Sequence, residues 1–149
     1  MLYFILISDH FFNLSEIFKH TLMTYPVLII DFTKYKELAD NVWNAQMAKH
    51  PRILTYDGPS LENRKGAMHY EVEEARFVIP SILSRDEYPF ACTREGGASS
   101  WIGHIPGRQN SAQGGLIAGF LRRNGIQPKK NEDSKFEVRV INHPNGNVI

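Results

Sequence analysis

The sequence predicts an α+β fold, in which a small mixed sheet is packed with helices. A branched apolar run at 26–32 is typical of a buried strand, and residues 35–47 repeat apolar side chains at helical spacing. Residues 135–142 alternate between apolar and polar side chains, as a half-buried strand does. The length of 149 residues fits one domain of ordinary size.

The elements expected before residue 80 are separated by clear start and stop signals. Thr33 is expected to cap the helix that follows the first strand, and Pro51 to end it. Ser60 is expected to cap the next helix. The expected elements are a short amphipathic helix at 14–22, a strand at 26–32, a helix at 35–47, a strand at 52–56 and a helix from 61 to about 69.

A β-hairpin followed by a helix is expected in the second half of the chain. Gly96 and Gly97 suit its turn, because glycine adopts positive φ freely. Asn110 or Ser111 is expected to start the helix, and Gly125 to end it. The expected elements are strands at 90–94 and 100–105, a helix at 110–125, a strand at 135–142 and a loose tail at 143–149.

Composition bounds the class of protein. Apolar residues make up 42% and charged residues 22%, which is ordinary for a globular chain and argues against disorder. No apolar run approaches the roughly 18–20 residues of a membrane span, so no membrane partner is expected. Cys92 is the single cysteine, which rules out an intramolecular disulfide. Its place within an expected strand, between Ala91 and Thr93, favours a packed thiol over a nucleophile.

Charge is unevenly divided along the chain. Residues 94–149 carry eight Lys or Arg against four Asp or Glu, although the whole chain has a net charge of +1. This basic part suits a polyanionic partner such as DNA, while random scatter in a neutral protein explains it about as well.

Polar residues gather where the hairpin is expected to open. They are Arg85, Asp86, Glu87, Arg94, Glu95, His104, Arg108, Asn110 and Gln113. Phosphodiester hydrolysis needs such a set: a base for water, a divalent metal ion and a cation for a phosphate oxygen. One carboxylate and one asparagine oxygen suffice for Mg²⁺, which keeps several of its waters. The alternatives are a solvated turn for Asp86 and Glu87 and a simple helix cap for Asn110.

The stretches "RDEYPFA", "C", "EGG" and "N-x-x-QG", in that order, resemble the NucA/NucB-type deoxyribonucleases, which are non-specific bacterial nucleases. The resemblance covers about residues 25–142, with 1–24 as an N-terminal extension and 143–149 as a tail. It implies a ββα-metal-like hairpin–helix site and a metal-dependent, non-specific endodeoxyribonuclease that uses Mg²⁺ or Mn²⁺. A non-catalytic nucleic-acid-binding relative is the alternative.

The resemblance also implies roles for single residues. Asp86 matches the catalytic carboxylate that acts as general base, and Glu87 matches a neighbouring metal or water contact. Asn110 matches the helix residue that faces the metal. Arg85 is a further expected catalytic residue. The expected substrate-binding residues are Arg94, Arg108, Gln113, Arg122 and Arg123. The expected structural residues are Glu95, Gly96, Gly97 and Cys92.

The chain departs from the secreted members that it resembles. Leu54 stands where they carry a second cysteine, so their disulfide with the Cys92 position is lost. The N-terminus has no basic residue before its apolar run, which makes a poor secretion signal. Because bacterial toxins reuse this domain, the resemblance implies a secreted or delivered toxin or effector, a neutralising immunity protein as partner, and a monomer.

Overall fold

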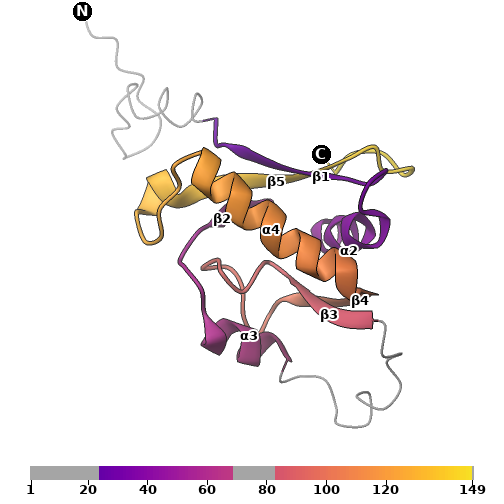
Figure 1. Ribbon diagram of the computed structural model, residues 1–149, viewed down its shortest axis with the longest axis horizontal. Coiled ribbons are helices and arrows are strands. Elements are labelled where there is room, and N and C mark those ends of the chain that lie inside the picture. The colour runs from indigo at the N-terminus through magenta and orange to yellow at the C-terminus, as the bar shows by residue number, and fades with distance from the viewer. Residues whose placement is uncertain (1–23, 69–82, 149) are drawn as a thin grey trace, which may run out of the picture.

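The computed structural model describes residues 24–68 and 83–148, in which two small sheets pack against helices (Figure 1). The three-stranded sheet has the order β1-β5-β2, from strands Val27–Asp31, Lys135–Ile141 and Ile53–Thr55. β5 runs parallel to β1 and antiparallel to β2. The predicted α+β class is therefore confirmed.

The second sheet is a two-stranded ribbon of β3, Leu83–Tyr88, and β4, Trp101–Pro106. The strands are antiparallel, and Asp86 lies opposite Gly103. The helix α4, Gly107–Arg123, follows β4 directly and runs across the molecule between the two sheets (Figure 1). A hairpin followed by a helix therefore forms as the sequence predicts.

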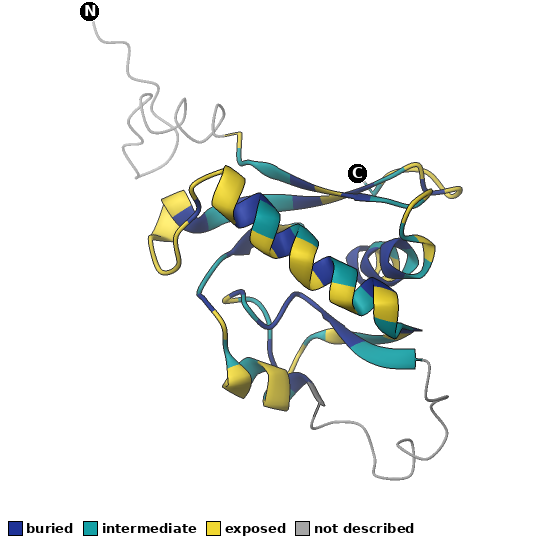
Figure 2. Cartoon of the chain, viewed as in Figure 1, coloured by how far each residue is buried: buried dark blue, intermediate teal, exposed yellow. Residues whose placement is uncertain are grey.

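Two further helices enclose this arrangement. α2, Lys36–Met47, packs against both sheets, and α3, Leu61–Met68, lies beside the ribbon. A 3₁₀ turn at Asn131–Ser134 precedes β5. Figure 2 shows that α4 turns a buried stripe inward and an exposed stripe outward. Its inward residues Ile117, Phe120 and Leu121 join a core made with residues of the three-stranded sheet and α2.

Several expected elements in the first half form as predicted. Strands at 26–32 and 52–56 and the helix at 35–47 correspond to β1, β2 and α2. Ser60 caps α3, because its Oγ accepts a 3.0 Å hydrogen bond from the Asn63 amide. Thr33 is not a cap: its amide and hydroxyl donate to Asp31 Oδ1, and α2 begins three residues later. The helix expected at 14–22 lies outside the described residues.

The first hairpin strand is Leu83–Tyr88 and not 90–94 as predicted. Residues after Tyr88 turn instead, and only Thr93 makes an isolated bridge, with Tyr56. This loop is held by side-chain hydrogen bonds to β2 in place of a strand pairing with β4. The Glu95 carboxylate accepts hydrogen bonds from the amide and hydroxyl of Thr55, at 2.8 Å each, which ties the loop to β2.

The tail expected to be loose is attached to α2. His143 is buried and stacks on Trp43, with ring centroids 4.4 Å apart. Its Nε2 lies 3.0 Å from Asp40 Oδ1. Trp43 Nε1 donates to the Gly146 carbonyl at 3.1 Å, so this part of the tail has a fixed course.

Candidate active site

A cavity of about 280 Å³ opens between α4, the end of β3, the loop after it and α3. Polar and apolar side chains share its wall. They are Tyr56, Arg64, Glu87, Phe90, Ala91, Cys92, Asn110, Gln113, Gly114, Ile117, Ala118 and Leu121. Three residues expected at the site from the sequence, Glu87, Asn110 and Gln113, therefore meet here.

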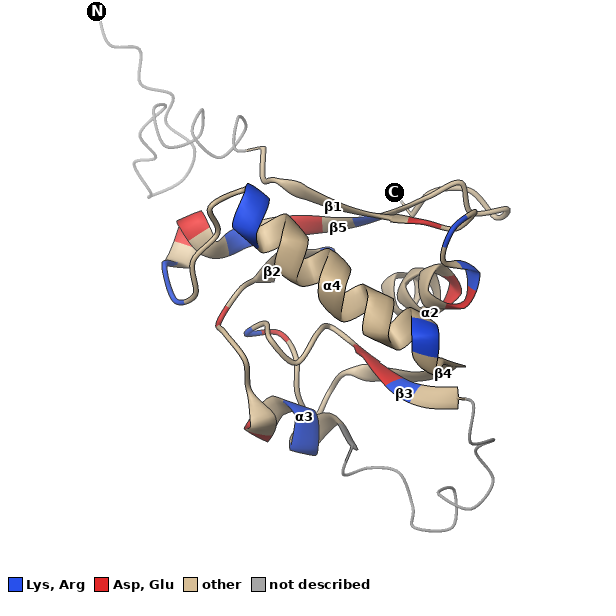
Figure 3. Ribbon diagram, in the orientation of Figure 1, with Lys and Arg blue, Asp and Glu red and all other residues tan. Residues whose placement is uncertain are grey.

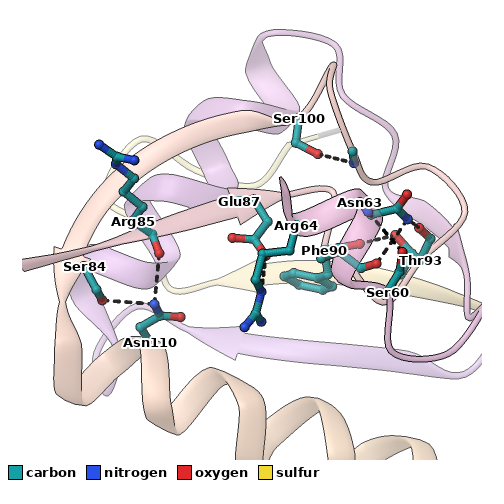
Figure 4. A network of polar contacts seen from close by, with 12 residues as sticks. Ser60, Asn63, Arg64, Ser84, Arg85, Glu87, Phe90, Thr93, Ser100 and Asn110 are labelled. Carbon is teal, nitrogen blue, oxygen red and sulfur yellow. Dashed lines mark hydrogen bonds and ion pairs between the residues drawn. The ribbon is translucent and has the colours of Figure 1, made fainter. Parts of the chain in front are cut away.

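Glu87 supplies the carboxylate of this cavity. Its side chain is 11% exposed, and its Oε1 lies 3.7 Å from Nε of Arg64 (Figure 4). Burial raises the pKa of Glu87 above that of an ordinary glutamate, and the positive charge of Arg64 opposes that rise. A carboxylate with a raised pKa at the wall of a cavity is a stronger proton acceptor than a solvated one.

Asn110 is held by its nitrogen, so that its oxygen remains for another partner. Nδ2 donates to Ser84 Oγ at 3.0 Å and to the Arg85 carbonyl at 2.9 Å (Figure 4). No described residue donates a hydrogen bond to Oδ1, so this oxygen is available to a ligand. Asn110 is not the helix cap that the sequence predicts, because α4 begins at Gly107, and residues 107–109 are helix and not loop.

Asp86 lies on the other side of β3 from Glu87, since neighbouring residues of a strand point to opposite faces. It is 1% exposed, which contradicts the expectation of a solvated turn, and it is not part of the cavity wall. Its Oδ2 accepts a 2.7 Å hydrogen bond from Asn41 Nδ2. Burial raises the pKa of Asp86 to about 6, an effect that the hydrogen bond from Asn41 and, more weakly, the amide of Gln113 oppose.

Asn41 connects Asp86 to the rest of the ribbon. Its Oδ1 accepts a 2.9 Å hydrogen bond from Trp101 Nε1, while its Nδ2 serves Asp86. The amide lies directly on Gly103, where an added Cβ would come within 2.0 Å of Asn41 Oδ1. Glycine at this position therefore makes room for the side chain that holds Asp86.

The loop after β3 forms one wall of the cavity and is fixed at several points. Asn63 Nδ2 donates to the carbonyls of Ala91 and Thr93, at 3.2 and 3.1 Å (Figure 4). Gly96 packs so closely that a Cβ would lie 2.3 Å from the Phe90 carbonyl oxygen. Gly97 has φ +126°, which requires glycine in practice. These contacts fix the course of the loop, and the structural role expected for Glu95, Gly96 and Gly97 stays a prediction.

Cys92 is a packed thiol. It lies at the cavity wall, and burial raises its pKa to about 11, so the thiol is protonated at neutral pH. Because the thiolate is the nucleophilic form, a thiol that stays protonated is a poor nucleophile.

The arginines expected at the site are spread over the molecule. Arg85 extends its side chain away from Asn110 (Figure 4), and Arg94 pairs with Asp57 at 3.8 Å. Arg108 lies in the first turn of α4, whereas Arg122 and Arg123 lie in its last turn. The structure does not gather these five into the cavity wall.

Two residues that sequence reasoning missed are central to the site. Arg64 reaches Glu87 from α3, and Asn41 reaches Asp86 from α2. Both contacts join residues far apart in the chain, and no local pattern marks them. A buried polar position at Asn41, on the apolar face of α2, is the one signal that could have been read from helical spacing.

The donors at the cavity suit a hard divalent ion. Glu87 and Asn110 offer oxygen atoms, and Mg²⁺ and Mn²⁺ prefer oxygen ligands. No group of three or more His, Cys, Asp or Glu side chains that could hold a metal occurs among residues 24–68 and 83–148. A metal at this cavity would therefore keep most of its waters, as Mg²⁺ commonly does.

Comparisons with known proteins identify the family. Residues 42–138, well over half of the chain, match the family model described as Deoxyribonuclease NucA/NucB. The match includes β3, β4, α4 and every residue of the cavity wall. No curated protein matches the chain. None of the helices in the described ranges is long and apolar enough to cross a bilayer. The chain therefore belongs to the deoxyribonuclease NucA/NucB family.

Proposed function

We propose that this protein is a metal-dependent endodeoxyribonuclease that hydrolyses phosphodiester bonds of DNA with little sequence preference. Membership of the deoxyribonuclease family supports the reaction class. The observation that carries the proposal is that Glu87 and Asn110 line one cavity, where the Asn110 oxygen accepts no hydrogen bond from a described residue. Their chemistry is that of water activation beside a hard cation.

Glu87 and Asn110 are the residues that would hold Mg²⁺ or Mn²⁺. When bound, such an ion polarises the phosphate and stabilises the charge on the leaving oxygen. Ser84 and the Arg85 carbonyl fix the amide nitrogen of Asn110, which fixes the direction of its oxygen. The site therefore needs little rearrangement to present an oxygen ligand.

Glu87 is also the carboxylate best placed to accept the proton of the attacking water. Water forms the new bond to phosphorus and its proton goes to a Glu87 oxygen, while the bond from phosphorus to one ester oxygen breaks and that oxygen takes a proton from solvent water. The catalytic role expected for Asp86 from the sequence is the competing prediction, and variants that remove the charge of each residue distinguish the two. The burial of Asp86 against Asn41 makes it a candidate for positioning the strand that carries Glu87.

Plasmid cleavage tests the function directly. Supercoiled plasmid with the purified protein and Mg²⁺ or Mn²⁺ should become nicked, then linear, then a smear, and EDTA should stop the reaction until the metal is restored. Plasmid that stays supercoiled at micromolar protein with either ion would contradict the proposal. Specific fragments in place of a smear would contradict the lack of sequence preference.

Delivery as a toxin or effector and neutralisation by an immunity protein are further proposals that rest on the family. A monomer is proposed as well. The non-catalytic alternative, a nucleic-acid-binding relative, would show DNA binding with no cleavage in the same assay. The family's name and the intact Glu87–Asn110 pair favour the enzyme.

A further inference from the structure

The cavity beside Glu87 has more apolar wall than a phosphate and a metal ion need. Arg64, Glu87, Asn110 and Gln113 supply its main charged and polar groups. Much of the remaining lining is apolar or aromatic, from Tyr56, Phe90, Ile117, Ala118 and Leu121. A phosphodiester is charged and hydrated, and an apolar wall offers it no favourable contact.

We propose that the apolar part of this cavity binds one nucleobase of the substrate strand, next to the phosphate that is cleaved. The inference rests on the proposed function. A nucleobase has apolar faces and polar edges, and bases bind proteins by stacking on aromatic side chains. The volume of about 280 Å³ is at the small end of ligand pockets, which suits one ring system and not a duplex.

Two small residues are part of the helix side of the cavity. Gly114 and Ala118 lie one turn apart on α4, and both are exposed. A Cβ at Gly114 would meet nothing within 4 Å, so no packing among the described residues requires glycine there. Glycine nevertheless weakens a helix relative to alanine. The glycine leaves free space beside the helix backbone on the cavity side.

A buried amide adds a polar group to the same wall. Gln113 is 7% exposed and lines the cavity. Its side-chain amide interacts with Asp86 and lowers the pKa of that carboxyl, although Nε2 makes no hydrogen bond of standard geometry with a described residue. The nitrogen carries two hydrogens, so Asp86 can take one and leave the other for a carbonyl oxygen or ring nitrogen of a nucleobase.

The consequence is a preference for unpaired bases. In duplex DNA a base is stacked and paired, and it must leave the stack to enter a protein pocket. Single strands, ends and locally opened duplex should therefore be cleaved faster than closed duplex. The preference concerns unstacking and not base identity, because every base has a face that can stack.

Two measurements test this with the full chain. The first compares binding of deoxyadenosine 5′-monophosphate and 2-deoxyribose 5-phosphate by calorimetry in EDTA, which needs no catalysis. The second maps cleavage of a single-stranded oligonucleotide with and without one abasic residue. We expect the nucleotide to bind tighter, and cleavage beside the abasic position to fall, each on the order of tenfold. Equal binding and equal cleavage would overturn the inference.

Matched glycine variants locate the pocket. Gly114→Leu places a side chain in the cavity, whereas Gly115→Leu, its neighbour outside the cavity wall, does not. Both should keep the wild-type melting temperature or raise it, because leucine favours helix over glycine. Only Gly114→Leu should lose the preference for the base-bearing probe. A preference that survives in Gly114→Leu would overturn the inference.

The outcomes for the two proposals are distinct. An oligonucleotide that stays intact at every position in Mg²⁺ and Mn²⁺ would contradict the proposed nuclease function, while the binding comparison still decides on the base pocket. Cleavage that ignores the abasic residue, with equal binding of the two probes, would keep the nuclease and remove the pocket.

Discussion

Asp86 and Glu87 are neighbours in sequence and have different surroundings. Glu87 faces a cavity and Arg64, whereas Asp86 is enclosed between the ribbon and Asn41. The alternation of the strand turns them to opposite faces, although the charge of Glu87 still raises the pKa of Asp86. Removing the charge of Asp86 and removing the charge of Glu87 should therefore have different effects on the protein.

Asp86→Asn should stabilise the protein above pH 6. Burial raises the pKa of Asp86 in the folded state to about 6 from 3.8, so its contribution to stability is full below about pH 4 and is lost as pH rises through 6. Two pKa units correspond to about 3 kcal/mol at most. The melting temperature of the variant should exceed that of the wild type at pH 8 by several degrees, and match it more closely at pH 4.

Asp133→Asn, which changes an exposed carboxylate in the 3₁₀ turn, serves as the control and should leave the melting temperature nearly unchanged at both pH values. A destabilised Asp86→Asn variant at pH 8 would mean that the charged form of Asp86 is favoured in the fold.

At the scale of elements, α2 fixes the ribbon through one side chain. The amide of Asn41 fills the space above Gly103 and bonds both Asp86 and Trp101. Gly103→Ala would push this amide away and leave buried polar groups without partners, at a cost of about 1–3 kcal/mol. Urea unfolding should show the loss as a lower midpoint.

The same substitution in an Asn41→Ala background isolates the contact. There Gly103→Ala should cost much less, because the atom with which it collides is gone. If Gly103→Ala lowers the free energy of unfolding equally in both backgrounds, the loss comes from the backbone of β4 and not from the contact with Asn41.

Elements with a local signal could be predicted from the sequence, and elements set by distant partners could not. Helical spacing located α2, and alternation located β5. The strand β3 was missed because its residues "LSRDEY" carry more charge than strands usually do, and because the apolar residues after it pack in a loop tied to Thr55 and Asn63.

The candidate site shows the same division. Its residue types could be identified by resemblance, and the structure brings Glu87, Asn110 and Gln113 together. The separation of Asp86 from Glu87, the start of α4 at Gly107 and the reach of Arg64 all depend on tertiary packing. Spacing in a sequence does not contain that information.

At the scale of the whole molecule, basic residues lie at both ends of α4 and on α3 (Figure 3). Arg122 and Arg123 are about 15–20 Å along the helix from Asn110, at roughly 1.5 Å per residue. DNA that lies along α4 would meet both ends, and a strand at the cavity would extend toward the two arginines.

Replacing Arg122 and Arg123 by alanine should weaken DNA binding without slowing the chemical step. Each phosphate contact adds roughly 0.9 to the slope of log affinity against log salt, so the slope should flatten by up to about two units. Cleavage rates of a fluorescent duplex at several salt concentrations measure this. Lys34→Ala with Lys49→Ala, which removes equal charge from the ends of α2, is the control pair. An unchanged salt slope would place DNA on another face.

The most direct test of the account compares Glu87→Gln with Asp86→Asn in Mg²⁺-dependent plasmid nicking at pH 8. Both changes remove one charge and keep the size of the side chain. We predict that Glu87→Gln lowers the rate about 10²-fold or more, as loss of a positioned base does, while Asp86→Asn keeps it within about tenfold. A folded Glu87→Gln variant that nicks plasmid at the wild-type rate, with Asp86→Asn inactive, would contradict the account.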